Sequence, residues 1–169
     1  MVKAMFADEK MRKDLNLSAV HSINWASIME KIVYYYVAAI ALGAPYRPVS
    51  YAVPTGNFGN VFAANAARKM GLPVHKLMEA TGVEPTLSPS MDIQISSNFE
   101  RYLFDLLGGD SDTLGSLMDS FGETKTFIVK KDLFAKSQAD FTAHRCSDEQ
   151  TLETIGNCYR ETGYILDPH

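Results

Sequence analysis

The segment from residue 48 to residue 80 constrains the fold more than any other part of this sequence. It contains a compact β-type run, Pro48–Pro54, then a turn rich in glycine and asparagine, then an alanine-rich helical stretch, Val61–Met70. A second β-type run, Val74–Ala80, follows. A strand, a tight turn, a helix and a strand make a βαβ unit, in which the strands are parallel and the crossover is right-handed. The sequence therefore predicts an α/β fold with a parallel sheet.

A long amphipathic helix is predicted just before this unit. Its apolar positions are Trp25, Ile28, Met29, Ile32, Val33, Tyr36, Val37 and Ile40. Their steps of three and one follow the 3.6-residue helical period and form one continuous stripe. Ser22 or Asn24 can cap its start, and Gly43 followed by Pro45 ends it. The apolar stretch is too short to span a bilayer.

The remaining elements are predicted from local signals. We expect a helix over residues 2–14, an extended piece over 17–20, and helices around residues 99–107 and 114–121. Ser97-x-x-Glu100 and Ser147-x-x-Gln150 have the pattern of capping boxes, the second opening a helix that runs to about Thr162. Short strands are expected at 126–129 and 164–166, and one could follow at 93–95.

Composition and charge exclude several classes of protein. Sixteen Lys and Arg against twenty Asp and Glu give a net charge of −4, which does not suit a nucleic-acid binder. Cys146 and Cys158 are too few for a disulfide framework or a zinc site, and the four histidines share no ligand spacing. The charged N-terminal segment is not a signal peptide. We expect a cytoplasmic protein with no metal, no membrane span and no nucleic-acid partner.

The strongest candidate site is the turn Pro54–Asn60, between a strand and the start of a helix. Backbone N–H groups in such a turn, together with the positive end of the helix, form a cradle for an anion. Gly56 and Gly59 allow the backbone to approach a phosphate closely, and the side chains of Thr55, Asn57 and Asn60 can add hydrogen bonds. Neither G-x-G-x-x-G nor G-x-x-x-x-G-K-[ST] is present. A tight βα turn with no ligand remains an equal alternative on the pattern alone.

Five segments in order resemble the threonine synthase family. They are residues 21–25 (HSINW), the run from Tyr51 through PTGNFGN to Pro73, residues 88–93 (SPSMDI), residues 96–101 (SSNFER) and residues 163–169, which begin GY and end DPH. Together they span nearly the whole chain. Five ordered matches are much more specific than one glycine-rich turn.

The resemblance implies a pyridoxal-phosphate enzyme of the fold type that includes tryptophan synthase β and cysteine synthase. Such lyases convert O-phospho-L-homoserine and water to L-threonine and phosphate, the last step of threonine biosynthesis. The family's loop for the cofactor phosphate corresponds to Gly56, Asn57, Phe58, Gly59 and Asn60, with Thr55 beside it. The implied fold is a parallel-sheet, three-layer segment of this α/β fold type.

Two departures from the family qualify this resemblance. The Schiff-base lysine of the family lies in a Phe-Lys-Asp motif, which does not occur among these residues, so no catalytic residue is assigned here. The family is also much longer, and its helix-containing connection is reduced here to residues 82–87. Residues 1–169 therefore resemble an incomplete central part of the catalytic region, with a shortened or missing connection near 81–87. We expect the chain alone to be inactive.

Roles beyond the loop are less specific. Asn98 and Arg101 lie one helical turn apart, and an arginine suits bidentate contact with a substrate phosphate. Alternatively, Arg101 pairs with Glu100, Asp105 or another surface carboxylate. Two other functions stay open: a related lyase acting on another phosphorylated amino acid, and a non-catalytic phosphate-binding scaffold. An α/β sheet taken from a longer protein exposes apolar edges, so self-association is also expected.

Overall fold

A three-stranded parallel sheet organises the protein. The computed structural model describes residues 5, 8–17, 24–80, 86–87, 96–144 and 146–168. The strands are β1 (Val49–Val53), β2 (Val74–Ala80) and β3 (Phe141–His144), in the order β1-β2-β3. Leu77 is fully buried in the central strand and pairs with Tyr51 on one side and Phe141 on the other. The predicted α/β class and the parallel pairing of the first two strands are confirmed.

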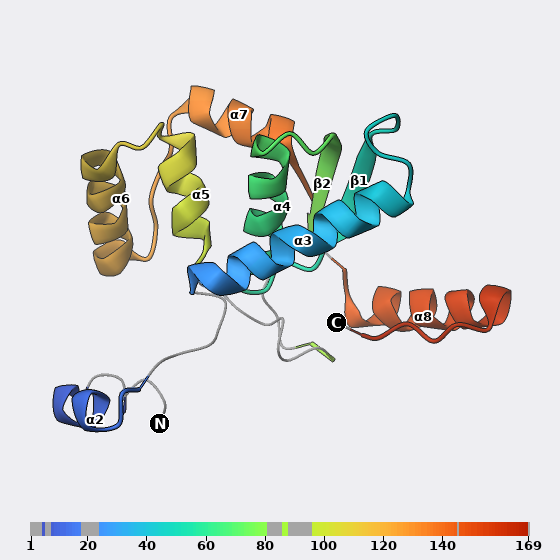
Figure 1. Ribbon diagram of the computed structural model, residues 1–169, viewed down its shortest axis with the longest axis horizontal. Helices are drawn as coiled ribbons and strands as arrows, with labels where there is room; N and C mark the ends of the chain where they lie inside the picture. The colour runs from blue at the N-terminus through green and yellow to red at the C-terminus, as the bar shows by residue number, and fades with distance from the viewer. Residues whose placement is uncertain are drawn as a thin grey trace.

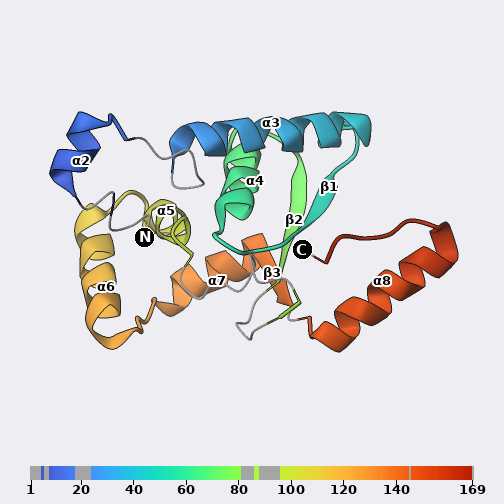
Figure 2. The same cartoon turned by 90° about the horizontal axis from the view of Figure 1, so that it is seen from below.

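The described part of the chain also contains helices, some of which pack on this sheet. Their bounds are α2 (Glu9–Asp14), α3 (Trp25–Ala41), α4 (Gly59–Lys69), α5 (Phe99–Leu106), α6 (Ser111–Thr124), α7 (Lys131–Asp140) and α8 (Asp148–Thr162). The long helix α3 crosses α4 and the strands β2 and β1 (Figure 1). Helix α5 packs beside α4, and α6 packs on the outer side of α5. Seen from below, α2 and α8 lie at the edges of the molecule (Figure 2).

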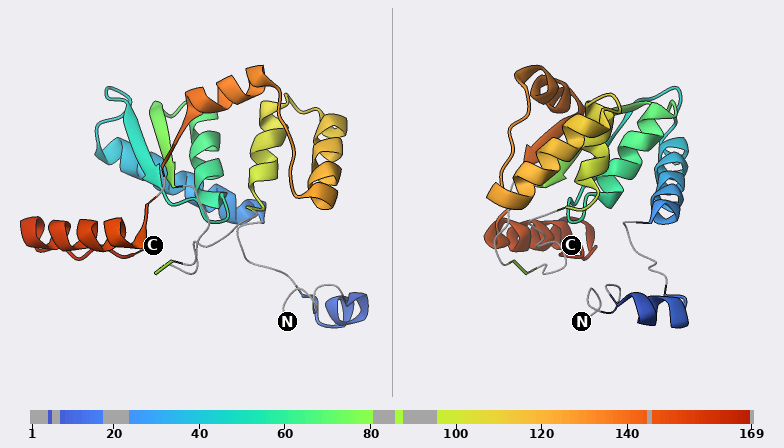
Figure 3. Two further views of the ribbon diagram at one scale, coloured as in Figure 1. Left: turned by 180° about the vertical axis from the view of Figure 1, so that it is seen from behind. Right: turned by 90° about the vertical axis from the view of Figure 1, so that its left-hand side faces the viewer.

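The core is formed by few of these elements. Its buried members come mainly from α3, α4, the strands and α5, with Leu72 between α4 and β2. Four helices, α2, α6, α7 and α8, contribute no buried residue. Figure 3 shows that α2 and α8 extend away from the body that holds the core. About half of the helical residues therefore stand outside the part of the protein that hydrophobic burial holds together.

The apolar stripe predicted on α3 is only partly buried. Ile28 and Ile32 face the core, with Ala39 farther along, whereas Val33 and Val37 are 56% and 62% exposed. Met29 and Ile40 are also exposed on the outer face. A continuous apolar stripe predicted one buried side, but among the described residues only one edge of the stripe packs against the core. Asn24 caps this helix as predicted, because its Oδ1 accepts from the N–H of Ala26.

Several local predictions were wrong, and others fall outside the described residues. Residues 126–129 and 164–166 form no strand, and the structure instead has α7 and β3, which were not predicted. Ser147 and Gln150 do form the predicted capping box. The possible strand at 93–95 and nearly all of the short connection at 81–87 lie outside the described residues. None of the described helices has the length and hydropathy required to cross a membrane.

Candidate functional site

The predicted loop lies between β1 and α4 and contains two left-handed residues. Gly56 has φ 42° and Phe58 has φ 62° with ψ 3°. Glycine adopts such angles at little cost, whereas a side chain disfavours them, so Phe58 must be held by its surroundings. Its N–H donates to the carbonyl of Thr55 at 2.8 Å, which closes the turn just before the helix.

The start of α4 can receive an anion. Phe58 is the residue that precedes the helix, and its side chain makes no capping hydrogen bond. The N–H groups of Gly59, Asn60 and Val61 belong to the first turn, where a helix supplies no acceptor of its own. These donors carry the positive end of the helix dipole. The loop residues therefore fit a phosphate group by geometry and by charge.

A cluster of aromatic rings holds Phe58 in place. Its side chain is 2% exposed, and its ring centroid lies 5.3 Å from that of Phe99, 5.9 Å from that of Phe141 and 6.0 Å from that of Tyr102. These partners come from α5 and β3. The left-handed backbone at residue 58 is thus maintained by packing between three elements that are distant in sequence.

Tyr102 also connects the cluster to a charged pair. Burial, and secondarily the charge of Asp140, raises the pKa of Tyr102 to about 12. Its hydroxyl donates to Asp140 at 3.3 Å, and Asp140 accepts from Arg68 at 2.6 Å. Arg68 lies near the end of α4, so this network joins α4 to the end of α7. The tyrosine stays neutral at physiological pH and serves as a donor.

A second loop, residues 96–98, contacts the first one closely. The hydroxyl of Ser96 donates to the carbonyl of Gly56 at 2.5 Å. Asn57 Oδ1 accepts from the backbone N–H of Ser97 at 3.1 Å and also from its hydroxyl. The carbonyl of Asn57 accepts from both the backbone N–H and the Nδ2 of Asn98, at 3.3 and 3.1 Å. The predicted capping box at Ser97 was wrong, since Ser97 binds Asn57 and Asn98 precedes the helix.

Asn98 and Arg101 contact each other, as their spacing suggested. Asn98 is fully buried, and its Oδ1 accepts from Nε of Arg101 at 3.1 Å. The guanidinium carbon of Arg101 lies 5.9 Å from the centre of the Trp25 ring, a cation–π arrangement. Asp105, one of the proposed alternative partners, binds Lys69 at 2.8 Å. A substrate-binding role for Asn98 and Arg101 stays a prediction.

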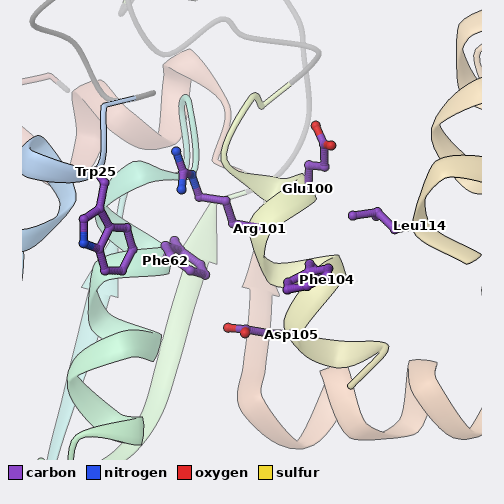
Figure 4. A pocket seen from close by; sticks show the side chains of 7 residues that line it. All are labelled: Trp25, Phe62, Glu100, Arg101, Phe104, Asp105 and Leu114. Carbon is purple, nitrogen blue, oxygen red and sulfur yellow. The ribbon is translucent and has the colours of Figure 1, made fainter. Parts of the chain in front are cut away.

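A groove of about 380 Å³ lies beside this pair (Figure 4). It is lined by Trp25, Phe62, Glu100, Arg101, Phe104, Asp105 and Leu114. These residues come from α3, α4, α5 and α6, and no residue of the Pro54–Asn60 loop lines it. Sequence reasoning missed this groove because its walls come from four separate helices, none of which carries a motif for it.

Tyr35 is another residue whose role the sequence did not reveal. Its hydroxyl donates to the carbonyl of Asn60 at 2.9 Å, and its own carbonyl accepts from the hydroxyl of Tyr51 at 2.8 Å. Burial, followed by the neighbouring Tyr51, raises the pKa of Tyr35 to about 12. The helix α3 is thereby joined to the first turn of α4. Within the described ranges, no group of His, Cys, Asp and Glu side chains could hold a metal ion.

Known proteins resemble this chain over its whole length. No protein-family model matches it. The chain is 47% identical to the threonine synthase of Pseudomonas aeruginosa and 39% identical to that of Saccharomyces cerevisiae. Each alignment covers the whole of this chain and 40% of the relative. "Threonine synthase-like 2" of Rattus norvegicus is 34% identical over 99% of the chain and 39% of its own length.

Solved structures give the same result. The PLP-bound threonine synthase of Brucella melitensis matches 99% of this chain with a TM-score of 0.94 and 44% identity. The yeast threonine synthase matches the same share with a TM-score of 0.88 and 37% identity. The matched part is 40% of the first of these chains and 39% of the second. The chain therefore spans about 40% of the length of the relatives that it matches.

Proposed function

We propose that this chain supplies the cofactor-phosphate loop of a pyridoxal-phosphate lyase. The premise is that the chain is homologous along its whole length to part of the threonine synthases. The observation that carries the proposal is the start of α4, where the preceding residue, Phe58, has no side-chain acceptor for the first-turn N–H groups, behind a loop with left-handed residues at 56 and 58. The residues assigned to the phosphate are Gly56, Asn57, Phe58, Gly59 and Asn60, with Thr55 beside them.

The residues of this loop have separate tasks. The first-turn N–H groups of Gly59 and Asn60 would bind the phosphate, while the side chain of Phe58 fixes the backbone that aims them. When bound, pyridoxal phosphate supplies an electron sink for the reaction, and the protein fixes its orientation. The intact enzyme would convert O-phospho-L-homoserine and water to L-threonine and phosphate. We place it in the cytoplasm, in keeping with the free thiols of Cys146 and Cys158.

A second candidate is a related lyase acting on another phosphorylated amino acid. This candidate is supported by the 34% identity to a protein whose name is only threonine synthase-like. Phosphate released from O-phosphohomoserine and from O-phosphothreonine by a full-length protein containing this sequence distinguishes the two. Faster release from O-phosphohomoserine supports threonine synthase, and faster release from O-phosphothreonine supports the alternative. No release from either would favour a non-catalytic scaffold.

Binding of the phosphate can be tested on this chain directly by NMR. Adding pyridoxal phosphate to the isotope-labelled protein should shift the amide signals of Gly59 and Asn60, because these N–H groups face the anion. Inorganic phosphate should shift the same signals, and pyridoxal, which lacks the phosphate, should not. The start of α8 is an internal control, since Ser147 already caps it. Equal shifts at α8, or none at α4, would contradict the proposal.

Self-association of the chain is expected from the outer face of α3. Met29, Val33, Val37 and Ile40 are each about half exposed or more, and such a contiguous apolar strip favours association. Sedimentation velocity should show oligomers that grow with concentration. Changing Val33 and Val37 together to Lys should yield a monomer, whereas Ile128→Lys, at a site 91% exposed elsewhere, should not. A monodisperse monomer of the unchanged protein at high concentration would refute this expectation.

A further inference from the structure

The side chain of Asn98 is deeply buried beside the phosphate loop. It is fully inaccessible to solvent and comes from a segment 41 residues beyond Asn57. A buried amide normally has its donor and acceptor groups hydrogen-bonded. Here Nδ2 donates to the carbonyl of Asn57 at 3.1 Å, and Oδ1 accepts from Arg101 at 3.1 Å. Both ends of the amide are thus used within the protein.

The contact with Asn57 fixes a single peptide plane. The carbonyl of Asn57 and the N–H of Phe58 belong to the same peptide group, which is planar and trans, so they point in opposite directions. Asn98 holds the carbonyl through two donors, and the carbonyl of Thr55 holds the N–H at 2.8 Å. Rotating this plane would break three hydrogen bonds. The plane sets φ of Phe58, and Phe58 leads directly into the first turn of α4.

We propose that Asn98 is a positioning residue, which holds the Asn57–Phe58 peptide so that the N–H groups at the start of α4 converge on a phosphate group. This inference rests on the proposed function of the loop and assigns Asn98 a part in it. Asn98 acts through the backbone of Asn57 and does not touch the phosphate. Arg101 has a supporting part. Its Nε donates to Oδ1 of Asn98, so the Nδ2 end of the Asn98 amide faces the carbonyl of Asn57.

The orientation of the Asn98 amide suggests a variant that tests the inference directly. Asp has nearly the same shape as Asn but lacks the Nδ2 donor, so Asn98→Asp places a carboxylate oxygen against the carbonyl of Asn57. A lost hydrogen bond in such a place corresponds to roughly a tenfold change in an equilibrium constant. Asn65 offers a matched control: it is 2% exposed on α4, and its Oδ1 accepts from Arg68, near the end of that helix farther from the loop. Asn65→Asp makes the same chemical change away from the loop.

The test compares these variants by phosphate affinity and by hydrogen exchange. We expect Asn98→Asp to weaken binding of inorganic phosphate and of pyridoxal phosphate about tenfold, with faster exchange at the Phe58 amide and unchanged exchange at Leu77 in β2. Asn65→Asp should bind phosphate within about twofold of the unchanged chain. Equal phosphate binding by the Asn98 variant, or an equal loss in both variants, overturns the inference.

Two further measurements distinguish failure of the positioning role from failure of a variant to fold and from failure of the proposed function. If Asn98→Asp does not fold, Arg101→Ala, at a half-buried position, decides: faster exchange at the Phe58 amide together with weaker phosphate binding and unchanged exchange at Leu77 supports the inference, and unchanged exchange at the Phe58 amide overturns it. Failure of the unchanged chain to bind inorganic phosphate or pyridoxal phosphate at α4 refutes the proposed function instead. Binding by the unchanged chain together with normal binding by the Asn98 variant refutes only the positioning role.

Discussion

The isolated chain is expected to form no L-threonine from O-phospho-L-homoserine. The family motif that contains the cofactor-bonding lysine, Phe-Lys-Asp, does not occur in these residues. The relatives that the chain matches are much longer, and this sequence corresponds to about 40% of them. The loop at the start of α4 would, on the proposed function, orient the cofactor phosphate, but orientation alone does not replace the group that bonds the cofactor. We therefore expect the rate to be indistinguishable from the uncatalysed one.

Phosphate release and threonine formation, each followed with and without added pyridoxal phosphate, measure this directly. The full-length threonine synthase of Pseudomonas aeruginosa, assayed under the same conditions, is the positive control. Borohydride reduction followed by mass spectrometry adds a test independent of turnover. Turnover by the chain, together with a borohydride-trapped adduct on one of its lysines, would contradict the prediction and assign the missing role to that lysine.

Phe58→Ala should produce the largest loss of stability of any single change in the loop. The variant removes a ring that contacts Phe99, Tyr102 and Phe141 at centroid distances of 5.3 to 6.0 Å. Truncation of a buried Phe costs about 3–5 kcal/mol, because apolar contacts are lost and a cavity remains. A loss of that size is a large part of the stability of an ordinary domain. Urea unfolding followed by circular dichroism would measure it.

Phe134→Ala is the matched control for this variant. Phe134 lies on α7 and is 53% exposed, so its removal should change the free energy of unfolding by only about 0.5 kcal/mol. Phe58→Leu should fall between the two, since it keeps part of the buried volume, and it keeps the test informative if the alanine variant does not fold. A loss from Phe58→Ala as small as that from Phe134→Ala would show that the aromatic cluster does not hold the loop.

The local elements were predictable from sequence where the signal was strong and short in range. The start of α3 at Asn24 and the capping box of α8 each depend on residues within one helical turn of each other, and both are present. The βαβ unit is also present, because its strand, turn and helix signals follow one another directly along residues 48–80. The strands expected at 126–129 and 164–166 had only β propensity to support them. A strand forms where a neighbour supplies its hydrogen bonds, and β3 is found instead where the chain passes beside β2.

The candidate site was likewise predictable from the sequence only in part. The position of the loop, its glycines and the start of α4 followed from the sequence alone, because turn and helix signals are local. The hydrogen bonds from Ser96 and Asn98 to the loop, and the ring contacts of Phe58, join residues about 40 or more positions apart. The helical period of the apolar residues could not show that about half of the α3 stripe is exposed in the described part of the protein. Such contacts depend on the path of the whole chain. The sequence therefore determined the position of the loop between β1 and α4, and the tertiary structure decided what holds that loop in shape.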